Sequence, residues 1–477
     1  MGITVKKDQD ISEWYTQVIQ KAELADYTRV SGCIVFRPRS YAIWEKVQKF
    51  LDDKLKKSGV KNAYFPLFIP ESLLCKEQEH VEGFTPEVAW VTHSGETKLA
   101  ERLAVRPTSE TIMYDSYSKW IRSHKDLPLR INQWCNVVRW EFKNPVPFLR
   151  TREFLWQEGH SCFATEQEAD SEVLEILDYY DEIYRDVYAI PALKGRKSEK
   201  EKFAGAKYTT SLEIFLPNGK AIQGCTSHCL GQNFSKAFDI SFLDENGSKQ
   251  NVWQNSWGYT TRSIGIMIMM HGDDKGLIIP PYVAPTQIVI VPIYKEDAKE
   301  KVLKEANKLK EKLEKNFSVD IDLREEYTPG WKFNDHELKG IPLRIEIGPK
   351  DLEKEQCVLV TRHDRKKEFV KLHDIKDEVE KAMKRMHHDL YTKAKAHLDS
   401  SIVELETSNE FMKAIDEKKI AYAPWCGSKE CEEMIKDETG GAKSLNIPFK
   451  QPKLKHGTRC FHCEEEAKYY AYFAKSY

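Results

Sequence analysis

The chain contains 477 residues, with 73 Lys and Arg against 75 Asp and Glu, which gives a formal net charge of −2. Its 41% hydrophobic and 11% aromatic residues exclude an intrinsically disordered protein, and its length predicts about two to four globular domains. The longest apolar run, residues 469–474, is far shorter than the roughly 20 residues of a membrane-spanning helix. The N-terminus has no apolar signal core, so we expect a cytoplasmic protein without a membrane partner.

The first 280 residues combine helical and β-type patterns. Apolar residues from 43 to 55 recur at intervals of three and four, which predicts an amphipathic helix that ends near Gly59. A strand is expected at 60–70, where two prolines are typical of a sheet edge. Short β-type runs then predominate around one helix at 166–184, so we predict a mostly antiparallel sheet with helices. These runs cover residues 87–92, 129–140, 153–158, 212–216 and 240–243.

A proline-rich segment, IIPPYVAP at 278–285, indicates a domain boundary. Beyond it a strand at 287–293 is followed by a helix at about 298–313, and this alternation predicts an α/β domain with a largely parallel sheet. Further strands are expected at 319–323, 343–347 and 357–361, and a long charged helix at 375–405. The predicted domains are therefore residues 1–284, 285–385 and 386–477.

Four of the eleven cysteines lie in the last 52 residues, whereas the other seven are scattered. Their spacing, C-x4-C followed by C-x2-C, is typical of a closed four-coordinate zinc site, so we predict structural Zn²⁺ at Cys426, Cys431, Cys460 and Cys463. His462 is a possible substitute ligand. The alternative is four unrelated buried thiols. A rival catalytic zinc centre would use His160, Cys162, Cys225, His228 and Cys229.

A predicted hairpin at 136–160 carries the densest set of chemically active side chains. Two β-type runs place Arg139 with Glu141 on one face, and residues 152, 154, 156 and 158 on another. Arginines, a stackable ring and carboxylates on one surface can bind phosphates, an aromatic base and an ammonium group together. The alternative, a solvated hairpin with cross-strand ion pairs, remains open on composition alone. Neither a P-loop nor a G-x-G-x-x-G motif is present.

Two further segments have both a functional and a structural interpretation. RPTSE at 106–110 places Thr108 and Glu110 where they could bind a small polar ligand, although the same residues suit the start of a helix at 111–120. Gly258 and Arg262 precede an apolar helix, and an arginine in that position can also be purely structural.

Together these segments resemble the three motifs of class II aminoacyl-tRNA synthetases. The strings PTSE (107–110), RTREFLWQEGH (150–160) and QGCTSHCLGQNFSKAF (223–238) resemble the prolyl-tRNA synthetase family of the archaeal and eukaryotic type. One departure is Val-Arg-Trp-Glu in the hairpin, where the class usually has Phe-Arg-x-Glu. The resemblance implies an α+β class II catalytic domain (antiparallel sheet with helices), an α/β anticodon-binding domain and a small zinc-binding C-terminal α/β domain.

The resemblance also implies a reaction and its partners. L-Proline and ATP, with Mg²⁺, would give prolyl-adenylate, and the prolyl group would pass to tRNA(Pro). Arg139 and Arg262 would be catalytic, because the reaction brings two negatively charged reactants together. The resemblance also implies a homodimer that pairs through the first motif. Gln223 follows Gly159 by only 64 positions, too few for the editing domain inserted in bacterial-type enzymes. A secondary amine offers a metal no hydroxyl group, which disfavours the rival zinc centre.

The implied binding residues form three sets. The ATP-binding set is Arg139, Glu141, Arg150, Thr151, Phe154, Gln223, Thr226, Thr260 and Arg262. The proline-binding set is Thr108, Glu110, Arg139, Trp156, Glu158, His160, His228 and Ser256, with Phe203 as a further wall. The anticodon set is Lys332, Glu337, Arg344, Glu346 and Lys350, with Arg362 beyond. The alternatives are a non-catalytic RNA-binding paralogue, which would be expected to lack the motif arginines, and a threonyl or glycyl specificity.

Overall fold

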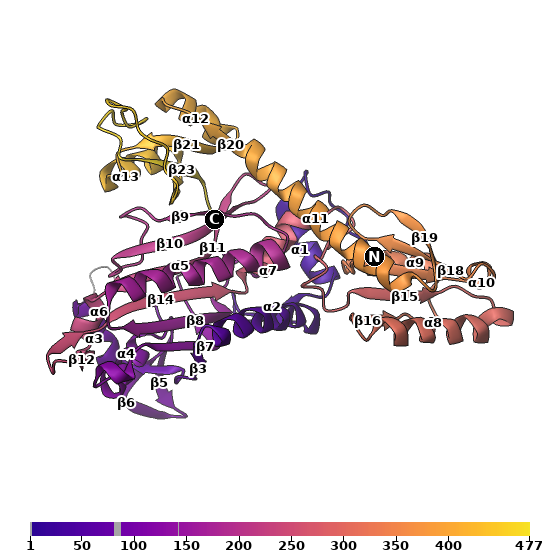
Figure 1. The fold of residues 1–477 in the computed structure, drawn as a ribbon, viewed down its shortest axis with the longest axis horizontal. Coiled ribbons are helices and arrows are strands. Elements are labelled where there is room, and N and C mark those ends of the chain that lie inside the picture. The colour runs from indigo at the N-terminus through magenta and orange to yellow at the C-terminus, as the bar shows by residue number, and fades with distance from the viewer. Residues whose placement is uncertain (1, 81–86, 142) are drawn as a thin grey trace.

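The computed structural model describes residues 2–80, 87–141 and 143–477. An 11-stranded sheet joins strands of the first 260 residues to the C-terminal strands, in the order β20-β21-β23-β22-β9-β10-β11-β14-β8-β7-β3 (Figure 1). Its central strands, β9 to β7 in that order, pair antiparallel, as the sequence predicts. They are β7 (Leu129–Val138), β8 (Glu153–Phe163), β9 (Leu193–Arg196), β10 (Tyr208–Phe215), β11 (Ala221–Gly231) and β14 (Trp253–Thr260).

Three helices cover one face of this sheet: α2 (Pro38–Lys57), α5 (Glu166–Glu182) and α7 (Arg262–His271). α2 ends at the Ser58 cap before Gly59, whose φ of +91° suits glycine. A capping box between Thr165 and Glu168 begins α5. The covered face carries the main hydrophobic core, so the opposite face of the central strands is left for a site.

The expected strand at 60–70 is divided into two short pieces. β3 (Lys61–Asn62) pairs parallel with β7, whereas β4 (Phe68–Pro70) joins a separate sheet with β6 (Thr97–Val105) and β5 (Trp90–Ser94). The prolines explain the division, because proline cannot donate a ladder hydrogen bond. The remaining elements of this region are α1 (Ile11–Lys21), β1 (Ala25–Tyr27), β2 (Ile34–Phe36), α3 (Glu71–His80), α4 (Glu110–Trp120), α6 (Asn233–Ala237), β12 (Ser241–Leu243) and β13 (Lys249–Asn251).

A five-stranded sheet in the order β16-β15-β17-β18-β19 follows the proline-rich segment. The prediction of a largely parallel sheet is wrong for half of its pairs, because β17, β18 and β19 pair antiparallel. The connections between these three strands are shorter than the dozen or so residues of a parallel crossover. The elements are β15 (Ile288–Pro292), α8 (Lys299–Leu313), β16 (Val319–Ile321), α9 (Pro329–Leu338), β17 (Leu343–Ile347), α10 (Pro349–Glu353), β18 (Gln356–Thr361) and β19 (Lys367–Lys371).

The long helix α11 (Ile375–Ser401) leads back to the central sheet (Figure 1). It ends before the expected residue 405, because the chain enters β20 (Ile402–Glu404). The C-terminal strands extend the central sheet through the β22–β9 pair, in which Gly195 lies opposite Pro448. A Cβ on Gly195 would lie 2.4 Å from a backbone oxygen, so this approach requires glycine. The elements are α12 (Ser408–Asp416), β21 (Ile420–Trp425), α13 (Lys429–Thr439), β22 (Ala442–Pro448) and β23 (Tyr469–Lys475). Among the described residues, no helix is both long and apolar enough to cross a bilayer.

Candidate active site

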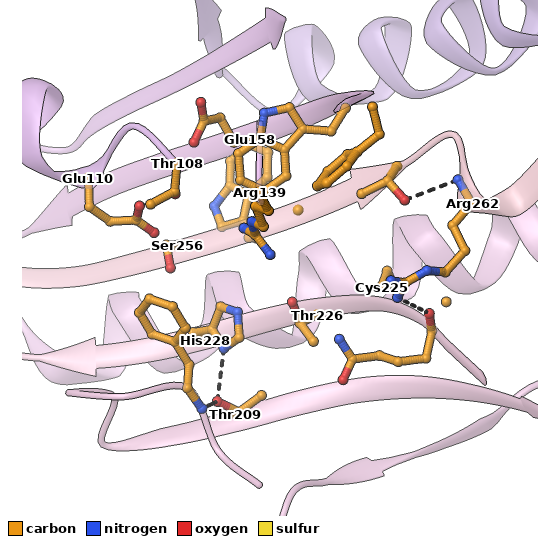
Figure 2. A pocket seen from close by; sticks show the side chains of 18 of the residues that line it. Thr108, Glu110, Arg139, Glu158, Thr209, Cys225, Thr226, His228, Ser256 and Arg262 are labelled. Atoms are coloured by element: carbon orange, nitrogen blue, oxygen red, sulfur yellow. Dashed lines mark hydrogen bonds between the residues drawn. The ribbon is translucent and has the colours of Figure 1, made fainter. Parts of the chain in front are cut away.

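A cavity of about 250 Å³ lies on the face of the central sheet that the helices leave open. Strands β8, β11 and β14 supply most of its wall, because alternate residues of a strand point to the same face. Figure 2 shows Thr108 and Glu110 at one end, Arg262 at the other and Arg139 between them. The cavity therefore brings together residues that are far apart in the sequence.

Two arginines give the cavity its positive charge. Arg139 follows β7; its Nε donates to the Pro107 carbonyl at 3.0 Å, and its guanidinium lies 5.4 Å from the centre of the Trp156 ring. Arg262, the first residue of α7, donates to the carbonyls of Leu149 at 3.0 Å and Gln223 at 3.2 Å. Because these acceptors are uncharged carbonyls, the contacts orient the guanidinium groups without neutralising them. Burial lowers the pKa of Arg262, although an arginine starts from so high a value that it stays charged.

The opposite end of the cavity is acidic. Glu158 is buried on β8 and accepts hydrogen bonds from the Ser109 backbone N–H at 3.1 Å and from Gln133 Nε2 at 3.0 Å. Burial acts to raise the pKa of Glu158, but hydrogen bonds from His160, Ser109 and Gln133 hold the pKa below its usual value. Thr108 donates its hydroxyl hydrogen to Glu110. Carboxylates at this end can bind an ammonium group while the arginines bind anions.

A neutral histidine forms part of the wall between these ends. Burial, reinforced by the positive charges of His160 and Arg139, lowers the pKa of His228 to about 3. Its Nδ1 lies 2.8 Å from Thr209 Oγ1, and its ring centre lies 4.8 Å from that of Phe203. His228 is therefore an uncharged, oriented ring at neutral pH, which suits contact with a small apolar group.

The structure places most of the sequence-predicted site residues on the cavity wall. Fifteen line it: Thr108, Glu110, Arg139, Thr151, Phe154, Trp156, Glu158, His160, Phe203, Gln223, Thr226, His228, Ser256, Thr260 and Arg262. Glu141 and Arg150 do not; both are exposed on the connection between β7 and β8, and Glu141 adjoins residue 142, which lies outside the described residues.

Sequence reasoning did not assign a site role to several lining residues. They are Phe148, Leu149, Glu201, Thr209, Gly224, Trp257 and Gly258, together with Cys225, considered only for the rival metal site. Gly224 lies inside the string 223–238, and Gly258 was named with Arg262, so both could have been found from the sequence. Glu201 lies in a charged run that carries no such signal.

The rival zinc centre does not form. Within the described part of the chain, the groups of side chains close enough to share a metal ion are the four C-terminal cysteines and the set Glu110, Glu158 and His160. His228 and Cys229 are adjacent in β11, so their side chains point to opposite faces of the sheet.

The four C-terminal cysteines do converge. Their sulfur atoms all lie within 4.8 Å of one another, with 3.8 Å between Cys431 and Cys460 and 3.5 Å between Cys426 and Cys463. A hydrogen bond from Cys431, together with backbone N–H groups, lowers the pKa of Cys460, which favours the thiolate. Four sulfur donors at these separations fit a tetrahedral Zn²⁺ ion.

The residues predicted to contact an anticodon lie on and around the five-stranded sheet. Lys332 is buried and donates to the Asp322 carbonyl at 3.1 Å. Arg344 pairs with Glu346 at 2.9 Å and with Glu337 at 3.3 Å. Arg362 is buried against Asp273 at 2.6 Å, whereas Lys350 is exposed.

Comparisons with known proteins agree with this fold. Three family models match: "tRNA synthetase class II core domain (G, H, P, S and T)" over residues 91–271, "Anticodon binding domain" over 287–382, and "Prolyl-tRNA synthetase, C-terminal" over 408–477. The chain is 51% identical over 484 residues to "Proline--tRNA ligase, cytoplasmic" of Arabidopsis thaliana, covering 100% of this chain and 91% of the relative. It is 50% identical over 473 residues to "Proline--tRNA ligase 2" of Bacillus cereus (strain ATCC 10987), covering 99% and 98%.

One relative is a longer protein, and this chain matches only a part of it. The chain is 48% identical over 499 residues to "Bifunctional glutamate/proline--tRNA ligase" of Mus musculus, covering 100% of this chain and 33% of that protein. These identities span the catalytic, anticodon-binding and C-terminal regions together. The chain therefore belongs to the prolyl-tRNA synthetase family of class II aminoacyl-tRNA synthetases.

Proposed function

We propose that the cavity between Glu110 and Arg262 is where L-proline reacts with ATP to form prolyl-adenylate, before the prolyl group passes to the 3′ end of tRNA(Pro). The observation that carries this assignment is the order of charges along the cavity: carboxylates at one end, Arg139 in the middle and Arg262 at the far end. Proline and ATP together need that order, because an ammonium, a carboxylate and a triphosphate must lie in line.

The chemical step is an attack of a proline carboxylate oxygen on the α-phosphorus of ATP, which breaks the bond between the α-phosphorus and the bridging oxygen and releases pyrophosphate. Both groups are negatively charged and repel each other. Arg139 reduces this repulsion because it binds the carboxylate and the α-phosphate at the same time. Arg262 binds the β- and γ-phosphates, and Phe154 stacks on adenine. Gln223 at the cavity wall would help to hold Mg²⁺ with the phosphates, and the ion would supply further charge neutralisation there.

The remaining ATP contacts come from Thr151, Thr226 and Thr260, which also line the cavity. We keep two further residues in the proposed ATP-binding set because of their positions in the motif. Glu141 would bind the adenine amino group, and Arg150 would bind the terminal phosphates. Both are exposed beside the cavity.

The proline pocket combines acceptors with apolar walls. Thr108 and Glu110 accept from the secondary ammonium group, and Trp156 and Phe203 enclose the ring, with His228 beside Phe203. Glu158 and His160 hold this end in place by their mutual contact at 3.3 Å, and Ser256 lies opposite on β14. Shape alone separates substrates that differ by a methylene by about 1–3 kcal/mol.

The other regions support a tRNA ligase of three domains, proposed at 1–284, 285–385 and 386–477. The five-stranded sheet would bind the anticodon through Lys332, Glu337, Arg344, Glu346 and Lys350. On its open face Phe369 is 72% exposed, beside Lys367 and Lys371 of the same strand. Sequence-specific RNA recognition works on unstacked bases, for which an exposed aromatic ring among lysines is a suitable surface.

We also propose structural Zn²⁺ at Cys426, Cys431, Cys460 and Cys463, a homodimer and a cytoplasmic location. For the dimer, eight of the exposed large hydrophobic residues lie between residues 27 and 140: Tyr27, Val30, Val35, Tyr41, Tyr64, Phe68, Trp120 and Trp140. A dimer interface would bury apolar side chains of this kind. Sedimentation of the full chain tests this, and a monomer at micromolar concentration would contradict it.

The described segment from Gly159 to Gln223 contains no inserted domain of the bacterial type.

The assignment of the cavity is tested with Glu110→Gln and Thr226→Val in the full-length enzyme. Glu110→Gln should raise the KM for proline more than the KM for ATP, and Thr226→Val should do the reverse. Equal effects of both variants on both constants would contradict the assignment.

A further inference from the structure

One threonine of the cavity wall connects two other wall residues. Thr209 lies on β10 and is only 1% exposed. Its Oγ1 accepts a hydrogen bond from the Phe203 backbone N–H at 2.9 Å and lies 2.8 Å from His228 Nδ1, a contact that Figure 2 shows as a dashed line. Phe203 comes from the connection between β9 and β10, and His228 comes from β11. A single hydroxyl group therefore joins this connection to the neighbouring strand.

The direction of the two hydrogen bonds follows from the groups that make them. A backbone N–H can only donate, so Thr209 Oγ1 accepts from Phe203. Burial keeps His228 uncharged at neutral pH by lowering its pKa, so one of its ring nitrogens carries a lone pair. The Thr209 hydroxyl hydrogen then has Nδ1 as its acceptor, which leaves the ring proton of His228 on Nε2.

The same contacts fix how two aromatic rings face each other in the wall. The ring centres of Phe203 and His228 lie 4.8 Å apart, with 37° between the ring planes. The backbone around Thr209 is also held, because its carbonyl accepts from the Lys197 N–H at 2.8 Å. The Phe203 carbonyl accepts from the Ala206 N–H at 3.0 Å. The connection between β9 and β10 is thus attached to Thr209 through both the main chain and the side chain.

We propose that Thr209 is a positioning residue for the recognition of proline: its hydroxyl group holds Phe203 and orients His228, so that the two rings form a fixed wall for the pyrrolidine ring. This inference rests on the proposed function of the cavity. One methylene group more or less in an apolar pocket changes the rate by about 10- to 200-fold, so the position of such a wall matters for specificity. Loss of the hydroxyl group should therefore affect proline more than alanine, whose methyl group is too small to fill the space between the rings.

The test is ATP–pyrophosphate exchange by the full-length enzyme with Thr209→Val and Thr209→Ala. In both variants the KM for proline should rise about tenfold with kcat little changed, because buried hydrogen-bonding groups lose their partner. The KM for ATP should stay at the wild-type value, and kcat/KM for alanine should fall less than kcat/KM for proline. Thr209→Ser keeps the hydroxyl group and should restore the KM for proline.

Thr210→Val is the matched control. Thr210 is the next residue of β10, is fully buried and donates its hydroxyl hydrogen to the Ser227 carbonyl at 2.8 Å, but its side chain points to the opposite face of the sheet. Thr210→Val should therefore lower the melting temperature much as Thr209→Val does, while both KM values stay at the wild-type level. The control separates a loss of stability from a change in the pocket.

Nitrogen NMR of the enzyme with labelled histidine provides a second readout. The signals that disappear in His228→Asn should report a proton on Nε2 in the wild type and a mixture of the two neutral forms in Thr209→Val. An unchanged KM for proline in Thr209→Val and Thr209→Ala, an equal rise in Thr210→Val, or a proton on Nδ1 of wild-type His228 would overturn the inference. Absence of exchange with proline in the wild type would instead overturn the proposed function of the cavity, so the two failures are distinguishable.

Discussion

Lys443 Nζ lies 2.7 Å from a carboxylate oxygen of Glu201, and this ion pair joins strand β22 of the C-terminal region to the wall of the active-site cavity. A second lysine, Lys197, also connects the segment beside the cavity to β22. It pairs with Glu213 and donates a hydrogen bond to the Leu445 carbonyl of β22 at 2.8 Å. The segment that carries Phe203 is therefore packed against the C-terminal region, so a part of the protein remote from the catalytic motifs supports the cavity wall that we propose binds proline.

Lys443→Ala should raise the KM for proline in ATP–pyrophosphate exchange several-fold, because Glu201 and the neighbouring Phe203 lose their support. The melting temperature should change little, since both partners are partly exposed and such ion pairs contribute about 0–1 kcal/mol. Lys443→Arg should keep the wild-type KM. Lys436→Ala, an exposed lysine of α13, is the matched control. An unchanged KM for proline in Lys443→Ala would show that this contact does not support the pocket.

Arg262→Lys should lower kcat for adenylate formation by about 10²–10³-fold, as removal of a preorganised charged donor does at other active sites. Lysine cannot reproduce the two carbonyl contacts that orient the guanidinium. The exposed Arg185, in the short helix Ile183–Val187 that follows α5, provides the control in Arg185→Lys. Pre-steady-state formation of prolyl-adenylate is the measurement, and a rate within threefold of wild type would be inconsistent with the proposed phosphate contact.

The sequence predicted which residues line the cavity better than it predicted how the strands of the sheets are connected. Arg139, Glu158 and Arg262 stood in motif strings, and their types alone limited what they could bind. The β22–β9 pair could not be predicted, because no pattern in the sequence around Gly195 indicates which distant strand pairs with it. The strands β17, β18 and β19 were predicted to be parallel because the alternation of strands and helices was assumed to continue past α9. The connections between these three strands are too short for a parallel crossover, so they pair antiparallel. The contact of His462 with Glu438 likewise depends on how α13 packs.

The free energy of unfolding should decrease as the pH falls, and part of this decrease should come from protonation of His271. Burial lowers the pKa of His271 to about 3, against a hydrogen bond with the Tyr188 carbonyl that favours the charged form. The unfolded chain, with a pKa near about 6.5, binds the proton first, so stability is lost as pH falls from about 6.5 towards 3. At pH 5 this single group accounts for a loss on the order of 2 kcal/mol.

Melting temperatures between pH 7.5 and 5 test this dependence. His271→Gln should be less stable than wild type at pH 7.5 but should lose less stability on acidification. His373→Gln, at a side chain that is 73% exposed, should follow the wild-type curve. Parallel curves for the wild type and His271→Gln would contradict the expectation.

Phe369→Ala should weaken tRNA use without affecting adenylate formation. Stacking of one base on an aromatic ring is worth about 1–3 kcal/mol, so the KM for tRNA(Pro) in aminoacylation should rise about tenfold. ATP–pyrophosphate exchange should not change, because it needs no tRNA. Phe449→Ala, at an exposed ring in the C-terminal region, is the control. An unchanged KM for tRNA in Phe369→Ala would remove this residue from the anticodon surface.

The most direct test of the central claim is ATP–pyrophosphate exchange by the purified full-length chain with each of the 20 amino acids in turn. The order of charges in the cavity and the neutral, aromatic pocket around His228 predict that proline gives the fastest exchange, and that alanine and cysteine follow at much lower rates. Faster exchange with any other amino acid, or no exchange with proline, would contradict the assignment of the cavity to proline activation.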